Sequence, residues 1–138
     1  MEVFITDENR EKNNVIYKIT CYIGSHYKEY HYIGLTKRPL EKRVYEHITN
    51  YKSAVYKFIK ENNVEAIHVE VLEQCKYEQL LDSAETRAIA DYILKRGTKN
   101  NQRNRLINID LKGLDNYTLR GVKEIYNMLQ FDWHVKWV

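Results

Sequence analysis

Few residues in this sequence break secondary structure or could cross-link the chain. Among 138 residues there are one proline, five glycines and two cysteines. Cys21 and Cys75 lie far apart and outside any CxxC spacing, which argues against a disulfide framework or a zinc site. No apolar run approaches the roughly 18 residues that cross a bilayer, and the first residues are too polar for a signal peptide. We therefore expect a soluble, cytoplasmic protein that does not contact membranes.

The chain also lacks a large excess of charge of either sign. It has 22 basic and 19 acidic residues, a formal net charge of +3. A domain that binds nucleic acid tightly is usually more basic, so the total charge permits such a partner without indicating it. The segment 95–105 nevertheless carries five basic residues and no acidic one. It is either a solvated loop or a surface that contacts phosphates.

Apolar periodicity divides the chain into strands and helices. Alternation and β-branched content predict three strands, at residues 14–23, 28–35 and 66–73. The first two strands form an antiparallel hairpin. Apolar residues at helical spacing predict four helices, at residues 36–48, 53–61, 78–96 and 118–129.

The remaining segments complete the expected architecture. Residues 1–13 are expected to be a loosely attached lead-in, and RLINI at 105–109 a short strand or extended segment. The predicted class is α+β, with a small three-stranded mixed or antiparallel sheet flanked by helices, in the order ββααβα followed by a C-terminal extension. That extension ends in FDWHVKWV at 131–138. We expect a final strand packed on the domain, with a homodimer or partner surface as the alternative.

Arg43 and His47 are one helical turn apart, so their side chains project from the same face. That face flanks an apolar stripe formed by Leu40, Val44 and Ile48. The pair is thus expected at the edge of the core, either as a surface pair or as part of a functional cleft.

Glu85 falls on the apolar stripe of its helix, four residues after Leu81 and four before Ile89. A carboxylate that faces a core is costly to ionise unless a cation compensates it. Mg²⁺ is commonly held by one or two carboxylates with water and substrate phosphate. The alternative is a salt bridge to a buried arginine.

Tyr17 and Tyr32 each lie at the centre of a strand of the predicted hairpin. Two tyrosines on a sheet are commonly packing residues. Beside an arginine, a histidine and a carboxylate they become candidates for proton transfer to or from water or a leaving oxygen.

These features together resemble the GIY-YIG nuclease family. The family has a GIY-like and a YIG triplet on adjacent strands, here VIY at 15–17 and YIG at 32–34. An arginine and often a histidine four residues on follow in the next helix, then a glutamate in a later helix and an asparagine after a short apolar segment. The residues that match in this order are Tyr17, Tyr32, Arg43, His47, Glu85 and Asn108. The resemblance covers roughly residues 14–110 and is closest to the catalytic domain of phage homing endonucleases.

The chain departs from the family pattern in three places. Val15 stands where the family usually has glycine. Residues 18–31 separate the triplets, slightly more than is usual, and a longer hairpin turn is expected to absorb the difference. Some relatives carry another histidine near the start of the second helix, where this chain has Lys52 and Ser53.

The resemblance implies a metal-dependent endonuclease. Residues 1–110 would form the nuclease domain, with residues 111–138 packed on it. Glu85 would hold Mg²⁺ or Mn²⁺ against the scissile phosphate, and Arg43 would donate to a phosphate oxygen. Tyr32 would orient water or phosphate, and Asn108 would support the site by hydrogen bonding.

Tyr17 is the expected general base for the attacking water. A phenol has an unperturbed pKa of about 10, so it needs assistance from His47, the metal or a nearby lysine. Lys18 and Lys37 are the candidate lysines.

The expected substrate is DNA, with RNA as an open alternative. Contacts are expected at the hairpin turn (residues 24–31) and at basic side chains, namely Lys18, Lys37, Lys99, Arg103 and Arg105. The competing hypothesis is a catalytically inactive protein on the same scaffold, which binds nucleic acid or a protein partner as a regulator. The retained set of polar residues favours catalysis, because a pure binding protein does not need it.

Overall fold

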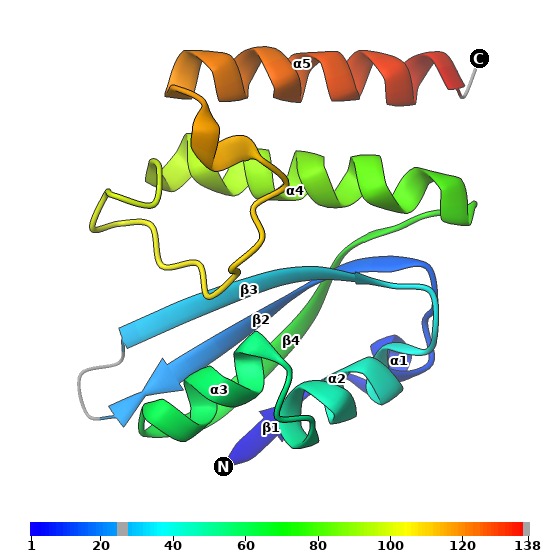
Figure 1. The fold of residues 1–138 in the computed structure, drawn as a ribbon. Coiled ribbons are helices and arrows are strands. Elements are labelled where there is room, and N and C mark those ends of the chain that lie inside the picture. Colours follow the sequence, from blue (N-terminus) through cyan, green and yellow to red (C-terminus); the bar gives the residue numbers. More distant parts are fainter. Residues whose placement is uncertain (25–27, 137–138) are drawn as a thin grey trace.

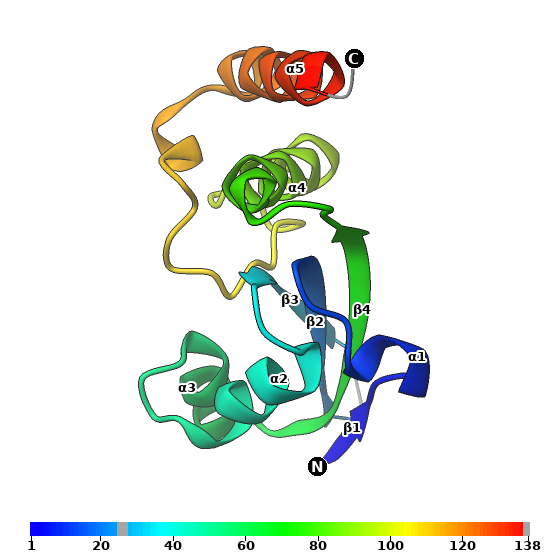
Figure 2. The same cartoon turned by 90° about the vertical axis from the view of Figure 1, so that its right-hand side faces the viewer.

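The computed structural model of the chain describes residues 1–24 and 28–136, with side chains as far as Gln130. The fold is layered around one mixed sheet of four strands, in the order β1-β4-β2-β3. Helices α2 and α3 cover one face of the sheet, α4 covers the other, and α5 packs on the outer side of α4 (Figures 1 and 2). The elements are β1 (Glu2–Phe4), α1 (Asp7–Arg10), β2 (Val15–Ile23), β3 (Lys28–Thr36), α2 (Leu40–Thr49), α3 (Ala54–Glu61), β4 (Val64–Gln74), α4 (Leu81–Arg96) and α5 (Leu119–Lys136).

The hairpin of β2 and β3 confirms the first two predicted strands. The two strands pair without interruption from Val15 opposite Thr36 to Ile23 opposite Lys28. Long strands therefore absorb the extra residues between the two triplets, and the expected long turn is wrong. Residues 28–31 belong to β3, and residues 25–27 lie outside the described part of the chain. This register places Tyr17 directly opposite Gly34.

The expectation of three strands and a loose lead-in is wrong. Residues 2–4 form β1, which pairs in parallel with β4 from Glu2 opposite Ala66. The following α1 is joined to α2, because Arg10 forms an ion pair with Glu41. Three exposed residues cannot show an alternating pattern, and their partner strand lies some sixty residues away in the sequence, so no local signal marked β1.

The C-terminal end is a helix, not the expected final strand. Helix α5 begins after Thr118, as predicted, but continues to Lys136. The side chains of residues 131–136, and residues 137–138 altogether, lie outside what the structure describes. A partner surface on this segment therefore stays a prediction.

The two faces of the sheet carry separate apolar cores. Tyr17 and Ile19 of β2 face α2 and α3, whereas Ile16 and Ile33 face α4. Strand alternation dictates this division, since successive side chains point to opposite faces. Tyr17 and Glu85 of α4 consequently start from opposite sides of the sheet. Their side chains can approach each other only around the outer edge formed by β3.

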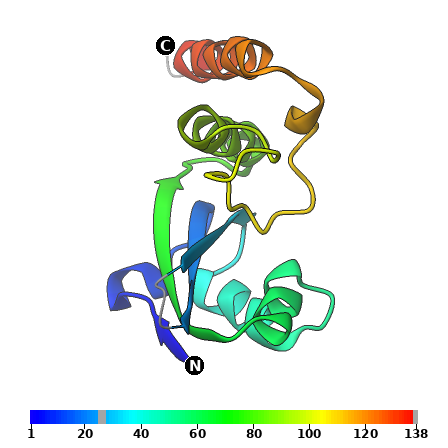
Figure 3. The same ribbon diagram turned by 90° about the vertical axis from the view of Figure 1, so that its left-hand side faces the viewer.

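The segment after α4 returns along this edge strand (Figure 3). His31 donates its N–H to the Arg105 carbonyl at 2.8 Å, and Ile107 donates to the His31 carbonyl at 2.6 Å. Asn108 then pairs with both backbone groups of Ile33. Its Oδ1 accepts the N–H at 2.9 Å and its Nδ2 donates to the carbonyl at 2.7 Å. The predicted extended segment at 105–109 thus covers part of an otherwise open sheet edge.

Asn108→Ala is expected to lower the free energy of unfolding by about 2–4 kcal/mol, because it leaves the N–H and carbonyl of Ile33 unpaired in a buried place. Urea denaturation measures this loss. Asn100→Ala, in an exposed turn, is the control and should change stability by less than about 0.5 kcal/mol. Equal stabilities of the two variants would show that the pairing at Ile33 does not anchor the segment.

Among the described residues, no helix is both long and apolar enough to cross a membrane. Cys21 and Cys75 are buried free thiols, as expected from their spacing.

Candidate active site

A polar cavity of about 460 Å³ opens at the β3 edge, between the α2–α3 layer and α4. It is lined by Tyr32, Leu35, Arg43, Ala54, Asp82, Glu85, Asn108, Ile109, Asp110 and Lys112. Four of the six residues singled out from the sequence therefore line one cavity. The other two, Tyr17 and His47, lie directly behind Tyr32. The ring centroids of Tyr32 and Tyr17 are 6.3 Å apart, and those of Tyr32 and His47 are 4.8 Å apart.

A buried chain of polar groups runs from Tyr17 through His47 to Ser53. Tyr17 Oη lies 2.6 Å from His47 Nε2, and His47 Nδ1 lies 2.7 Å from Ser53 Oγ. Ser53 is also the N-cap of α3, where its Oγ accepts the backbone N–H of Val55 at 3.2 Å. The helix start therefore fixes the hydroxyl that orients the histidine ring. The sequence shows Ser53 as a helix cap, but only the fold shows that it bonds to His47.

Gly34 makes the position of the Tyr17 phenol possible. A Cβ atom at Gly34 would lie 2.6 Å from Tyr17 Oη and 2.8 Å from a ring carbon of Tyr32. Because Gly34 has no side chain, the rings of Tyr17 and Tyr32 can both pass close to its backbone and reach His47. The glycine of the YIG triplet thus serves a close approach of side chains.

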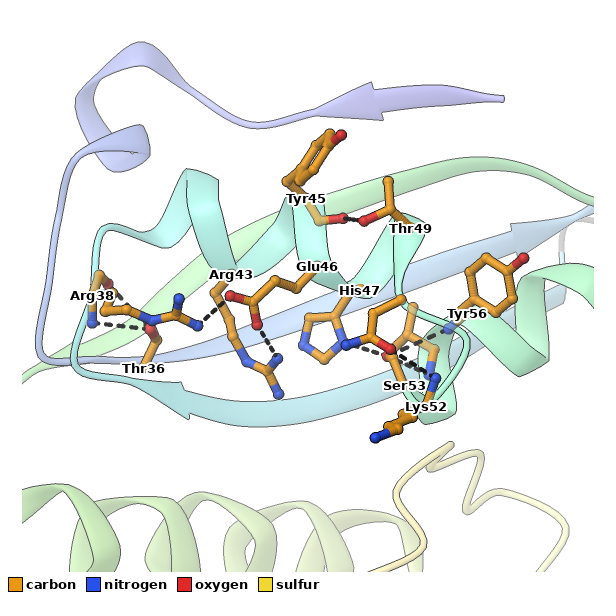
Figure 4. Close-up of polar contacts among 12 residues, drawn as sticks. Thr36, Arg38, Arg43, Tyr45, Glu46, His47, Thr49, Lys52, Ser53 and Tyr56 are labelled. Carbon is orange, nitrogen blue, oxygen red and sulfur yellow. Dashed lines mark hydrogen bonds and ion pairs between the residues drawn. The ribbon is translucent and has the colours of Figure 1, made fainter.

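Arg43 reaches the cavity from α2, held by an acidic neighbour. Its guanidinium donates to Glu46 at 3.0 Å, and Glu46 also pairs with Arg38 (Figure 4). Figure 4 shows the Arg43 guanidinium and the Lys52 ammonium pointing the same way, toward the side of the molecule on which α4 lies. A fork of donors held in this manner suits the oxygens of a phosphate.

Burial sets the protonation states of the two groups at the centre of the chain. It raises the pKa of the Tyr17 phenol far above its ordinary value, with the neighbouring Tyr32 adding to the rise, so Tyr17 stays protonated. Burial also lowers the pKa of His47 to about 3, and the positive charge of Arg43 contributes. His47 is therefore a neutral imidazole at physiological pH.

The neutral state of His47 makes the stability of the fold sensitive to acid. In the unfolded chain the histidine protonates below about pH 6.5, whereas in the fold it resists protonation down to about pH 3. Between these values the unfolded state binds more protons, so stability is lost as the pH falls. At pH 4.5 we expect the His47 contribution to cost about 3 kcal/mol.

Urea denaturation between pH 7 and 4 measures this loss. The wild-type curve should fall more steeply with decreasing pH than that of His47→Gln, which has no group to protonate at this position. Parallel curves would contradict the account of a neutral, buried His47.

Glu85 is buried, and its partner is a lysine from the loop after Asn108. Glu85 Oε1 lies 2.9 Å from Lys112 Nζ, so the sequence alternative of a buried arginine partner is wrong. Burial raises the pKa of Glu85, and the Lys112 ammonium opposes this rise. Lys112 carries no recognisable sequence signal, since nothing local relates position 112 to position 85.

The residues at Glu85 fit one kind of metal. Within the described part of the chain, no group of three or more His, Cys, Asp or Glu side chains is arranged to hold an ion. A fully protein-ligated metal such as structural zinc therefore does not fit these residues. Mg²⁺ or Mn²⁺, held by one carboxylate and otherwise by water and phosphate, does fit a buried glutamate on an open cavity.

The predicted nucleic-acid-binding residues are scattered. Lys18 pairs with Glu70 at 3.0 Å and Lys37 with Glu78 at 3.9 Å. Lys18 neighbours Tyr17 in the strand, so it faces the opposite side of the sheet and cannot assist the phenol. Their predicted contacts with nucleic acid stay predictions.

In the basic loop, Lys99 is exposed, and its ammonium donates to the Leu106 carbonyl within the same loop. The Arg105 guanidinium lies over the Tyr30 ring, 5.7 Å from its centroid, and Arg103 is exposed. This is a combination of basic and aromatic groups that suits single-stranded bases as well as phosphates. The predicted nucleic-acid contacts of this loop also stay predictions.

Comparisons of the chain with protein-family models, with curated proteins and with solved structures gave no match. The geometry of the cavity and the sequence resemblance are therefore the observations from which a function can be proposed.

Proposed function

We propose that this protein is a metal-dependent endonuclease that hydrolyses phosphodiester bonds of DNA at the cavity beside β3. The observation that carries the proposal is the meeting of a fixed guanidinium, a tyrosine–histidine pair and a buried carboxylate around one open polar cavity. These groups come from three separate elements, α2, β2 and α4, and from both faces of the sheet. Simple packing does not require such a meeting.

Each group has a role in the proposed reaction. Arg43 binds a non-bridging phosphate oxygen and stabilises the charge that develops there. Glu85 would hold the divalent metal, which supplies charge neutralisation at the phosphate and the leaving oxygen. Tyr32 lines the cavity and orients the attacking water. Asn108 holds the cavity wall against β3 through Ile33.

The general-base step is a relay, because Tyr17 remains protonated. Tyr17 Oη would take a proton from an attacking water that reaches it past Tyr32, as it passes its own proton to His47 Nε2. This requires the His47 tautomer that carries its proton on Nδ1 and donates it to Ser53 Oγ. The neutral His47 is able to accept, although its low pKa makes it a weak base.

The second candidate is a regulator that binds nucleic acid or a protein without cutting. The Glu85–Lys112 ion pair favours it, because this pair compensates the buried carboxylate with no metal present. If the Glu85–Lys112 ion pair were permanent, Glu85 could not hold a metal. Arg43 would then only bind an anion in the cavity, and the protein would not cut.

Cleavage assays separate the two candidates. Purified protein is incubated with supercoiled, linear, branched and single-stranded DNA and with RNA, in Mg²⁺, in Mn²⁺ or in EDTA. The endonuclease proposal predicts nicking or cutting of DNA that EDTA abolishes. Binding without cutting on every substrate would support the regulator.

A further inference from the structure

Lys112 is held in an unusual backbone conformation. Its φ is +57°, in the left-handed region that few residues other than glycine adopt. The Asp110 side chain stabilises this turn, because its Oδ1 accepts the Lys112 backbone N–H at 2.8 Å. Gly113, at φ +76°, continues the turn in the same region. Such a conformation persists only where surrounding contacts maintain it, and these contacts place the lysine beside α4.

The ammonium of Lys112 pairs with the carboxylate that would hold a metal at Glu85. Its Nζ lies 2.9 Å from Glu85 Oε1 and 3.8 Å from Asp82 Oδ1. Mg²⁺ binds a carboxylate oxygen at about 2.0–2.1 Å. An ammonium and a divalent cation at the same oxygen would lie within about 5 Å of each other and would repel each other. The lysine therefore opposes metal binding at Glu85 unless its ammonium moves away.

The structure allows that movement. The Lys112 side chain is 32% exposed, whereas that of Glu85 is 11% exposed. A lysine carries its charge on a flexible four-carbon stem, so the ammonium can leave while the turn stays in place. Asp82, with a side chain 88% exposed, offers the departing ammonium a solvated partner.

We propose that the Lys112 ammonium is the counter-ion of the Glu85 carboxylate in the free protein and competes with the divalent metal for this carboxylate. This inference rests on the proposed function and adds to it a mechanism that regulates metal binding at Glu85. Metal binds only the fraction of molecules in which the ion pair is open, so its apparent affinity is reduced by that fraction. A nucleic-acid phosphate supplies both an anion for the displaced ammonium and ligands for the metal. The metal is thereby loaded together with the substrate.

Binding of Mn²⁺ to the full chain, measured by electron paramagnetic resonance of the free ion without nucleic acid, tests the competition. Lys112→Met removes the ammonium and should tighten Mn²⁺ binding about five- to tenfold. This factor is expected if the Lys112–Glu85 ion pair is closed in about 80–90% of the molecules. Lys112→Arg keeps the charge and holds the carboxylate with a fork of donors, so binding should be weaker than in the wild type.

Three further variants complete the design. Lys95→Met removes a lysine that pairs with Asp91 at 2.9 Å on the same helix, and it should leave Mn²⁺ binding unchanged. Glu85→Gln should abolish the binding. Lys112→Gly suits the left-handed turn and repeats the test should the Met variant fold poorly.

The outcomes distinguish this inference from the proposed function. One outcome is Mn²⁺ binding that depends on Glu85 and yet is no tighter in Lys112→Met and Lys112→Gly than in the wild type. This result would support the metal site and overturn the competition. If Lys95→Met tightens Mn²⁺ binding as much as Lys112→Met does, the effect comes from the change in net charge. This result would also overturn the competition. No binding in any variant overturns the inference together with the metal-dependent function.

Discussion

Glu85→Gln is expected to lower the rate of Mg²⁺-dependent DNA cleavage by about a thousandfold. Glutamine keeps the shape of the side chain but removes the charge that would hold the metal. A bound metal contributes several kcal/mol of transition-state stabilisation, and each 1.4 kcal/mol corresponds to a factor of ten in rate. Asp82 and Asp110 line the same cavity, so a residual rate above background would come from them.

The fold should tolerate Glu85→Gln. Lys112 loses its carboxylate partner but remains in contact with water, as its side chain is 32% exposed. The unfolding free energy should therefore change by less than about 1 kcal/mol. Glu124→Gln is the matched control, because Glu124 is an exposed residue of α5 whose partner is Arg120 at 3.7 Å. Cleavage by Glu85→Gln at the rate of this control would remove Glu85 from the site.

Tyr17→Phe is expected to lower the cleavage rate about 10²- to 10⁴-fold, the range for loss of a general base. The ring is completely buried, and phenylalanine keeps its packing. Only the hydroxyl that contacts His47 Nε2 is lost. Single-turnover cleavage at saturating protein measures the chemical step apart from binding.

The chain offers a matched control on the other face of the sheet. Tyr92 Oη lies 2.6 Å from His31 Nδ1, a buried tyrosine–histidine contact of the same length in the core on the α4 side of the sheet. Tyr92 Oη also accepts the backbone N–H of Arg105 at 3.2 Å, so Tyr92→Phe should cost at least as much stability as Tyr17→Phe, about 1–2 kcal/mol, without affecting cleavage. If both variants cut at the wild-type rate, the relay through Tyr17 is wrong. If both lose activity equally, the loss reflects stability alone.

Local patterns were sufficient for most of the elements. The hairpin, α2, α3, β4 and α4 each have their own periodicity and their own breakers, so the sequence predicted them within a few residues. β1 was missed because a parallel edge strand of three residues depends on a distant partner. The helical conformation of residues 131–136 was missed because the aromatic and β-branched residues there also suit a strand.

The candidate site was only partly predictable. Periodicity identified Glu85 as a carboxylate on an apolar stripe, and helical spacing placed Arg43 and His47 on one face. Nothing in the spacing shows that side chains from opposite faces of the sheet meet around β3. The expectation that they form one site came from the family resemblance. Ser53 and Lys112 entered the site through contacts that only the folded chain creates.

We propose that DNA is cut at the cavity beside β3 with a metal held at Glu85. The most direct measurement is the conversion of supercoiled plasmid to nicked and linear forms in Mg²⁺, by wild-type protein and by Glu85→Gln purified in parallel. We predict conversion by the wild type that EDTA stops and that Glu85→Gln lacks. Conversion at equal rates by both proteins, or by neither, would contradict the claim.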